Sequence, residues 1–337
     1  FVLRITLVLL ACAFCEASLL YAIESVWIAP NSTNSGTIPA SFVQINPSSN
    51  ETTTLKTWQF PNSTFLTGSA YDPVHHVYYL SYVQYLPLKS YLAAIDVETS
   101  EWLIKDVDFS NGALVEWDFD IDTHGVLHFI SRSAHSLCHN AMCLVDTNTY
   151  DPSSGRSQIL HKAVASSPKL SYLIYDEPSE TIITSANGDL TGSPDSVVTI
   201  SNNYTTSRIP ASSNVSKQGS ISANKQTGKK YLIQTMVNNV QRIVEYVPGM
   251  NEYPVVCNIS TPEGHRQYRY SLTDMSSIDV TTNTFSFAIN RLLVSEYDTH
   301  KLFYGVISIN LDTCEQSSYL RPHGRLNNLT GLEYDSQ

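Results

Sequence analysis

The chain is short of charge, of positive charge above all, and of helical periodicity. Only 15% of its 337 residues are charged, and 20 Lys and Arg against 31 Asp and Glu give a net charge of -11. Negative charge argues against nucleic acid and anionic membrane surfaces as partners. After the first two dozen residues, we find no long segment whose apolar residues recur with the period of an amphipathic helix.

Motifs that mark common catalytic and cofactor sites are also lacking. The sequence has no phosphate-binding loop, dinucleotide fingerprint, H-E-x-x-H, EF-hand loop or haem signature. It has no G-x-S-x-G elbow, and its ten histidines cannot be joined into a Ser-His-Asp set from sequence alone. We therefore predict no specific reaction.

The first residues have the pattern of a signal peptide. Arg4 precedes the apolar run ITLVLLACAF, and Cys15–Ala17 supplies small residues for cleavage. The run is about 10 residues long, which is too short to span a bilayer core of about 30 Å as a helix. We expect a signal peptide at 1–17 and one domain at 18–337, without a membrane span after cleavage. An uncleaved signal anchor is the alternative.

Seven N-glycosylation sequons agree with this route. They begin at Asn31, Asn50, Asn62, Asn203, Asn214, Asn258 and Asn328. We expect a glycoprotein that is secreted or held in the lumen of the secretory pathway.

Four of the six cysteines remain after signal cleavage, and an even count in an oxidising compartment suggests two disulfides. We expect Cys138–Cys143 to close a short loop, which leaves Cys257–Cys314 as the second bridge. A zinc site formed by Cys138 and Cys143 with His135 and His139 is the alternative. The C-x4-C spacing is unusual for zinc.

What the sequence does contain is a repeat of about 52 residues. Each of five units opens with a strand pattern that ends in an apolar residue followed by Asp or Asn. These anchors are Asp72, Asp122, Asp176, Asn224 and Asp279, which lie 50, 54, 48 and 55 residues apart. A second strand-and-turn mark follows about 24 residues later, as at Asp96 and Asp146. Asp and Asn suit both turns because their side chains bond nearby backbone amides, so each unit holds four short strands.

Two partial units at the chain ends complete each other. Leu329–Asp335 (LTGLEYD) repeats Leu66–Asp72 (LTGSAYD) but stops after the first strand, whereas Leu20–Phe60 holds the other three. Sharing one unit between the ends would close a ring of six and leave no open edge. An open solenoid is the alternative, but it would need capping repeats.

This layout resembles the six-bladed β-propeller superfamily over nearly the whole mature chain. The resemblance implies an all-β fold of six blades, each with four antiparallel strands, closed by pairing of the C-terminal strand with the N-terminal blade. No motif narrows the family. The general likenesses are secreted calcium-dependent lactonase and esterase propellers, and secreted ligand-binding propellers of the yellow/royal-jelly type.

In the resembled architecture, function lies on the face of the loops that join the second and third strands of a blade and those that join blades. The candidate residues on this face are His135, His139, His265, Arg266, His300 and His323. The first strand of each blade lines the channel, where Asp118, Asp120 and Glu333 could hold Ca²⁺. Solvated side chains that bind nothing are the alternative in both places.

We expect a secreted, glycosylated binding or matrix module that is not an enzyme. Its partner would be an extracellular protein, a glycan or a small molecule. The alternative is a calcium-dependent hydrolase of the lactonase or esterase propeller type, with the ion on the channel axis. Metal content and the effect of Ca²⁺ on thermal stability would separate the two.

Overall fold

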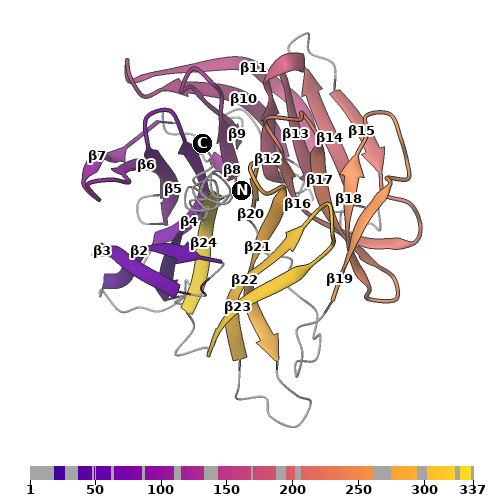
Figure 1. The fold of residues 1–337 in the computed structure, drawn as a ribbon. Helices are drawn as coiled ribbons and strands as arrows, with labels where there is room; N and C mark the ends of the chain where they lie inside the picture. Colours follow the sequence, from indigo (N-terminus) through magenta and orange to yellow (C-terminus); the bar gives the residue numbers. More distant parts are fainter. Residues whose placement is uncertain are drawn as a thin grey trace, which may run out of the picture.

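The computed structural model describes residues 19–26, 37–47, 49, 51–61, 64–85, 88–109, 115–132, 143–167, 170–186, 195–201, 206–260, 275–293, 302–322 and 327–334. Twenty-four strands in this part of the chain form six four-stranded blades, and Figure 1 shows them around a common axis. The all-β, six-bladed fold predicted from the repeat is confirmed.

Each blade runs from its innermost to its outermost strand in chain order, except the first. Blade 1 contains β24 (Asn327–Tyr334), β1 (Leu20–Val26), β2 (Thr37–Asn46) and β3 (Glu51–Pro61); blade 2 contains β4 (Thr64–Asp72), β5 (Val77–Tyr85), β6 (Leu88–Asp96) and β7 (Trp102–Val107); blade 3 contains β8 (Val115–Ile121), β9 (Leu127–Arg132), β10 (Cys143–Asp151) and β11 (Arg156–Ser167).

The other three blades follow the same order. Blade 4 contains β12 (Leu170–Asp176), β13 (Thr181–Ala186), β14 (Ser196–Ser201) and β15 (Thr206–Pro210), with a short 3-10 helix, η1 (Glu177–Ser179), between β12 and β13; blade 5 contains β16 (Val215–Ala223), β17 (Lys230–Met236), β18 (Gln241–Tyr246) and β19 (Val255–Ile259); blade 6 contains β20 (Ser276–Asp279), β21 (Thr284–Leu293), β22 (Leu302–Asn310) and β23 (Gln316–Pro322).

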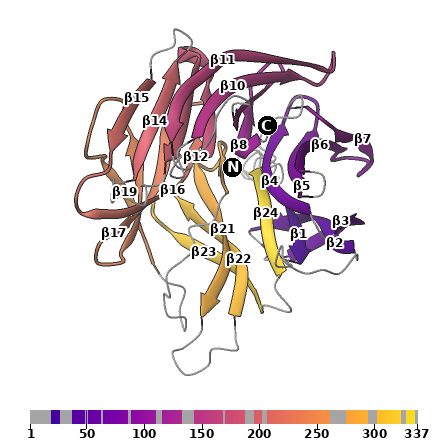
Figure 2. The ribbon, with the colours of Figure 1, turned by 180° about the vertical axis from the view of Figure 1, so that it is seen from behind.

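Blade 1 is shared between the two ends of the chain. Strand β24 pairs antiparallel with β1, and Tyr334 lies opposite Leu20. Both ribbon views show β24 in yellow beside the indigo strands of the N-terminal region (Figures 1 and 2). Strand β24 also contacts β4 of blade 2 and β20 of blade 6, so it ties three blades together.

The hydrophobic core is divided into six clusters, one between each pair of neighbouring blades. The cluster between blades 6 and 1 includes Met275, Tyr304, Leu332 and Tyr334. Alternation of side chains along a strand sends one set of residues into each flanking interface. Because the last interface is as apolar as the others, the ring is packed all the way round.

Side chains of Asp and Asn shape the turns after the innermost strands, as the repeat predicted. The carboxylate of Asp72 accepts hydrogen bonds from the backbone amides of Val74 and His75. Asn224 accepts from Gln226 and Thr227 in the same way. Such turns are local, so the sequence pattern alone encodes them.

The turn predicted at Asp146 was wrong. Asp146 lies inside β10 and is buried, and the turn that follows belongs to Asp151, whose Oδ1 accepts from the amide of Ser153. Thr147 and Asn148, which follow Asp146, pair with both β9 and β11. Their backbone is therefore extended and cannot form the turn.

Irregular pairing interrupts β4, β8, β12 and β16 at similar distances before their anchors. Two residues at these points have positive φ, Asp118 at 99° and Tyr172 at 62°. Next to the first of them, a Cβ on Gly68 would lie 2.7 Å from the Cα of Asp118. Glycine is needed there because the inner strands of blades 2 and 3 approach so closely.

Candidate functional site

Two cavities lie on the axis, where the six inner strands converge. We call the first the inner chamber: it has a volume of about 290 Å³ and is lined by residues of β4, β8, β12, β16, β20 and β24. We call the second the mouth chamber: it has a volume of about 370 Å³ and is lined by the turns after β4, β8, β12 and β16. Pro73, Ala223 and Lys225 line both chambers, so the two adjoin at these residues.

The carboxylates of Asp118 and Asp120 hold blade 3 against blade 4. Oδ2 of Asp118 accepts from the amide of Leu173 at 3.3 Å, and Oδ2 of Asp120 accepts from the amide of Tyr175 at 2.8 Å. Strands β8 and β12 pair in parallel at one position only, Trp117 with Ser171. The two side chains thus extend this short pairing by acting as acceptors for backbone amides of β12.

Lys225 reaches across the channel from the turn after β16. Its Nζ donates to Oδ1 of Asp120 at 3.1 Å and to the carbonyl of Ile121 at 2.8 Å. Partial burial disfavours the ammonium, but the charge of Asp120 and the hydrogen bond to it outweigh burial and raise the pKa of Lys225. The side chain remains 52% exposed, so solvent reaches it.

Glu333 is the third acid of the inner chamber and lies on β24. Burial raises the pKa of Glu333 well above its usual range, against a hydrogen bond from Ser69, and repulsion from Asp118 and Asp120 adds to the rise. Oε1 of Glu333 accepts from Oγ of Ser69 at 2.8 Å. Glu333 therefore favours its neutral form more than an ordinary glutamate does.

The mouth chamber combines an apolar lining with carboxylates that have partners. Pro73, Val74, Tyr175 and Pro178 contribute apolar surface, and Val74 is 68% exposed. Tyr175 is stacked on the ring of His128 at 3.5 Å between centroids. The acids pair with nearby groups: Asp72 with His75, Asp122 with His128, Asp176 with Lys230, and Glu177 with Thr123 and His124.

The predicted calcium ligands do come together, since Asp118, Asp120 and Glu333 all line the inner chamber. Their contacts do not fit Ca²⁺, which takes six to eight oxygen ligands. Asp118 and Asp120 bind backbone amides, and an ammonium already pairs with Asp120. In the described ranges, no group of three or more His, Cys, Asp or Glu side chains is placed to hold a metal ion.

The residues predicted for the opposite face lie outside the described residues. They are His135, His139, His265, Arg266, His300 and His323. Sequence reasoning missed Lys225 and the mouth chamber because the turns after the inner strands were assigned to the face away from the site. One signal was present: Lys225 directly follows the anchor Asn224.

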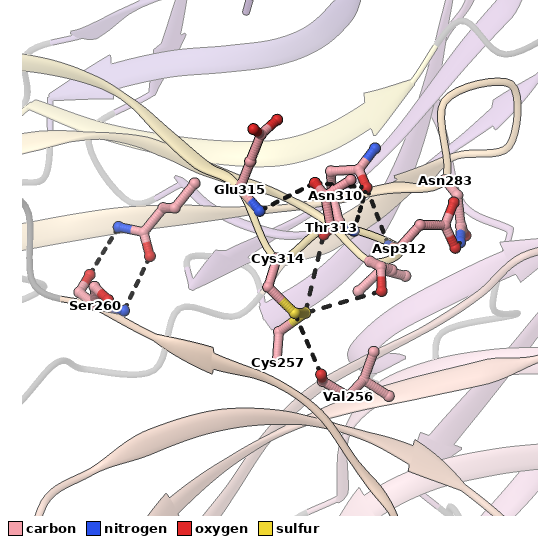
Figure 3. Close-up of a disulfide and its surroundings, with 11 residues drawn as sticks. Val256, Cys257, Ser260, Asn283, Asn310, Asp312, Thr313, Cys314 and Glu315 are labelled. Carbon is pink, nitrogen blue, oxygen red and sulfur yellow. Dashed lines mark hydrogen bonds between the residues drawn. A yellow bond between two sulfur atoms is a disulfide. The ribbon is translucent and has the colours of Figure 1, made fainter.

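Cys257 and Cys314 form a disulfide, the pairing left over once Cys138 and Cys143 were assigned to each other. It joins β19 of blade 5 to the turn after β22 of blade 6 (Figure 3). Cys138 and the side chain of Cys143 lie outside the described residues, and the predicted bridge between them stays a prediction.

Two sequon asparagines, Asn214 and Asn258, are described with their side chains, and both are exposed. Asn31, Asn50, Asn62 and Asn203 lie outside the described residues, and Asn328 is described only as part of β24. Among the described residues, no helix has the length and apolar character that a membrane crossing requires.

No family model matches the sequence, and no curated protein matches it either. Solved structures match the fold. TolB from Acinetobacter baumannii has a TM-score of 0.58 at 10% identity, covering 95% of this chain and 67% of its own. A chain of a nidogen/laminin complex has a TM-score of 0.53 at 11% identity, and the match covers 94% of this chain and 98% of that one. A putative 6-phosphogluconolactonase from Bacteroides fragilis has a TM-score of 0.52 at 9% identity, and the match covers 95% of this chain and 99% of that one. At such identities the likeness concerns the fold alone.

Proposed function

From the premise that this chain is a six-bladed β-propeller, we propose that it is a secreted, N-glycosylated binding module. Its ligand lies on the channel axis, in the inner and mouth chambers. The proposal is preferred to a hydrolase of the lactonase or esterase propeller type with Ca²⁺ on the axis. Both kinds of protein share the fold, so the choice depends on the site.

The observation that carries the proposal is that two of the channel carboxylates already bind other groups of the protein. Asp118 and Asp120 anchor β12 through backbone amides, and Asp120 also pairs with Lys225. Oxygens committed to such bonds are poor calcium ligands, because Ca²⁺ takes six to eight oxygen ligands. What is left is a rigid cavity with an apolar mouth and a few fixed polar groups, which is the usual form of a ligand site.

Calcium distinguishes the two functions. We expect the melting temperature of the purified protein to be the same in millimolar CaCl₂ and in EDTA, because no ion has to be bound. A calcium-dependent hydrolase would instead be stabilised by about 2.7 kcal/mol at 100 times its Kd. A rise in melting temperature with Ca²⁺ that is lost in Asp118→Asn would favour the hydrolase and contradict the binding module.

Glycan removal tests the secretory part of the proposal. Peptide-N-glycosidase should lower the apparent mass of protein collected from the medium of secreting cells. Asn214→Gln and Asn258→Gln should each remove one glycan, because both side chains are exposed. Protein that stays inside the cells, or whose mass does not change on treatment, would contradict the proposal.

A further inference from the structure

We infer that the junction of the two chambers is an ammonium-binding site that Lys225 occupies in the absence of ligand. The ligand class is an amphipathic primary amine. Its ammonium replaces that of Lys225 at Asp120 and Ile121, and its apolar body fills the mouth chamber. The inference rests on the proposed function, because it assigns a chemical class to the axial ligand.

The ammonium site is already built, since Lys225 fills it. Nζ has two acceptors on β8, the carboxylate of Asp120 at 3.1 Å and the carbonyl of Ile121 at 2.8 Å. An ammonium carries three donors and no acceptor, and a charged pair with a carboxylate is a strong hydrogen bond. Asp120 is held in place by the amide of Tyr175, so its oxygens stay oriented if Lys225 leaves.

Lys225 can leave without disturbing the strands. It belongs to the turn between β16 and β17 and crosses the channel to blade 3. Half of its side chain is in solvent. The backbone of its turn is fixed by Asn224 and does not depend on the ammonium.

The charge of the cavity selects a cation. Among the described side chains that line the two chambers are six aspartate and glutamate side chains besides Glu333, whose raised pKa favours its neutral form, and a single lysine, Lys225. A cavity lined mostly by one sign of charge concentrates ions of the opposite sign. Anionic ligands for Lys225 are disfavoured, because they would have to pass Asp72, Asp122, Asp176 and Glu177.

The mouth chamber supplies the apolar part of the affinity. Lys225 competes as a tethered amine, at an effective concentration on the order of millimolar or more. A small polar amine cannot displace it, whereas burial of apolar surface adds about 25 cal/mol for each Å². Pro73, Val74, Tyr175 and Pro178 offer that surface on the path to the ammonium site.

The test removes the ammonium of Lys225 by mutation and adds a free alkylamine that can take its place. In Lys225→Ala, n-hexylammonium should bind at least tenfold more tightly by calorimetry than in the wild-type protein, and more tightly than n-butylammonium. Hexanol and hexanoate, which share the chain but lack the cation, should show no gain. Lys229→Ala is the matched control, because Lys229 pairs with Glu245 away from the axis and should behave as wild type.

Asp120→Asn in the Lys225→Ala background should abolish the gain, since it removes the charge and keeps an oxygen for the amide of Tyr175. Lys225→Gln serves as a second opened variant if the alanine variant misfolds. Equal binding of hexanol and hexylammonium, or an equal gain in Lys229→Ala, would overturn the inference. Calcium independence would still stand in that case, so the two proposals fail separately.

Discussion

The carboxylates of Asp118 and Asp120 on β8 act as hydrogen-bond acceptors for backbone amides of β12, a role that backbone carbonyls have in a regular sheet. Strands β8 and β12 pair directly at one position, and the two carboxylates accept the amides of Leu173 and Tyr175 beyond it. A buried amide left without an acceptor costs about 1–3 kcal/mol. Asp118 and Asp120 therefore stabilise the contact between blades 3 and 4, with or without a ligand in the cavity.

The protonation of Glu333 makes stability depend on pH. Because its pKa is raised in the folded protein, the folded state holds more protons than the unfolded state once pH exceeds the unfolded value. Stability therefore falls as pH rises from the unfolded pKa of Glu333 to its folded pKa. Glu333→Gln removes this loss and can still accept the hydrogen bond from Ser69.

We therefore expect Glu333→Gln to melt higher than wild type at pH 7.5, and the difference to shrink toward zero near pH 4. The measurement is the melting temperature of both proteins across this range. A difference that stays constant with pH would mean that glutamine acts through packing. A wild type that melts higher at pH 7.5 would contradict the raised pKa.

Side-chain convergence at the axis was predictable only in part. Strand alternation placed Asp118, Asp120 and Glu333 on one inner face, and the structure brings them into one chamber. The pair between Lys225 and Asp120 joins residues 105 positions apart across two blades. No local pattern encodes such a contact, and a lysine in a turn is more often a solvated surface residue.

Strand β24 contributes more to stability than a terminal segment usually does. Leu332 is fully buried and Tyr334 nearly so, in the cluster between blades 6 and 1. The amide of Tyr334 donates to Oγ of Ser277, and its hydroxyl lies 2.7 Å from Oγ of Ser286, both in blade 6. Burying such a side chain contributes about 1.5–3 kcal/mol, against a typical total of about 5–15 kcal/mol.

A chain that ends at Asn328 should therefore be retained in cells or aggregate, because β1 loses its inner partner and exposes an edge. A chain that ends at Tyr334 keeps β24 and is the control; it should be secreted as efficiently as the full chain. The measurement is the amount and melting temperature of protein in the medium. A stable, secreted chain ending at Asn328 would contradict the role assigned to β24.

The ends of the inner strands were predictable from the sequence where the residues that form the turn are close together in the chain. Asp72, Asn224 and Asp279 each accept an amide two residues later, so the pattern in the sequence and the structure coincide. The pattern was ambiguous in β10, where Asp146 and Asp151 both follow apolar residues or strand formers. Only pairing with the neighbouring strands shows which of them ends the strand.

The molecule as a whole is a ring of six blades with an apolar interface between each neighbouring pair, and the two ends of the chain pair with each other inside blade 1. Complementary partial repeats predicted this closure. What the sequence could not predict is the cavity, because its shape depends on how closely the inner strands approach, as at Gly68 and Asp118.

Circular permutation tests the closure. Tyr334 lies opposite Leu20, so a short turn can join them. New ends between Thr227 and Gly228 keep one blade shared, whereas new ends between Ser212 and Ser213 fall between β15 and β16 and leave every blade whole. We expect the second permutant to melt several degrees lower, since only side-chain packing then holds its terminal blades together. Equal melting temperatures would contradict a stabilising role for the shared blade.

The shared blade also determines the order in which the blades can be completed during biosynthesis. Strands β1, β2 and β3 emerge first, yet their inner partner β24 is made about 300 residues later. At translation rates of about 5–20 residues per second, the wait is roughly 15–60 seconds. For that whole interval the inner edge of β1 is an unsatisfied pairing surface on a nascent chain. Blade 1 therefore begins before the other five blades but cannot be completed until β24 has been made, and until then its open edge is free to pair with another strand.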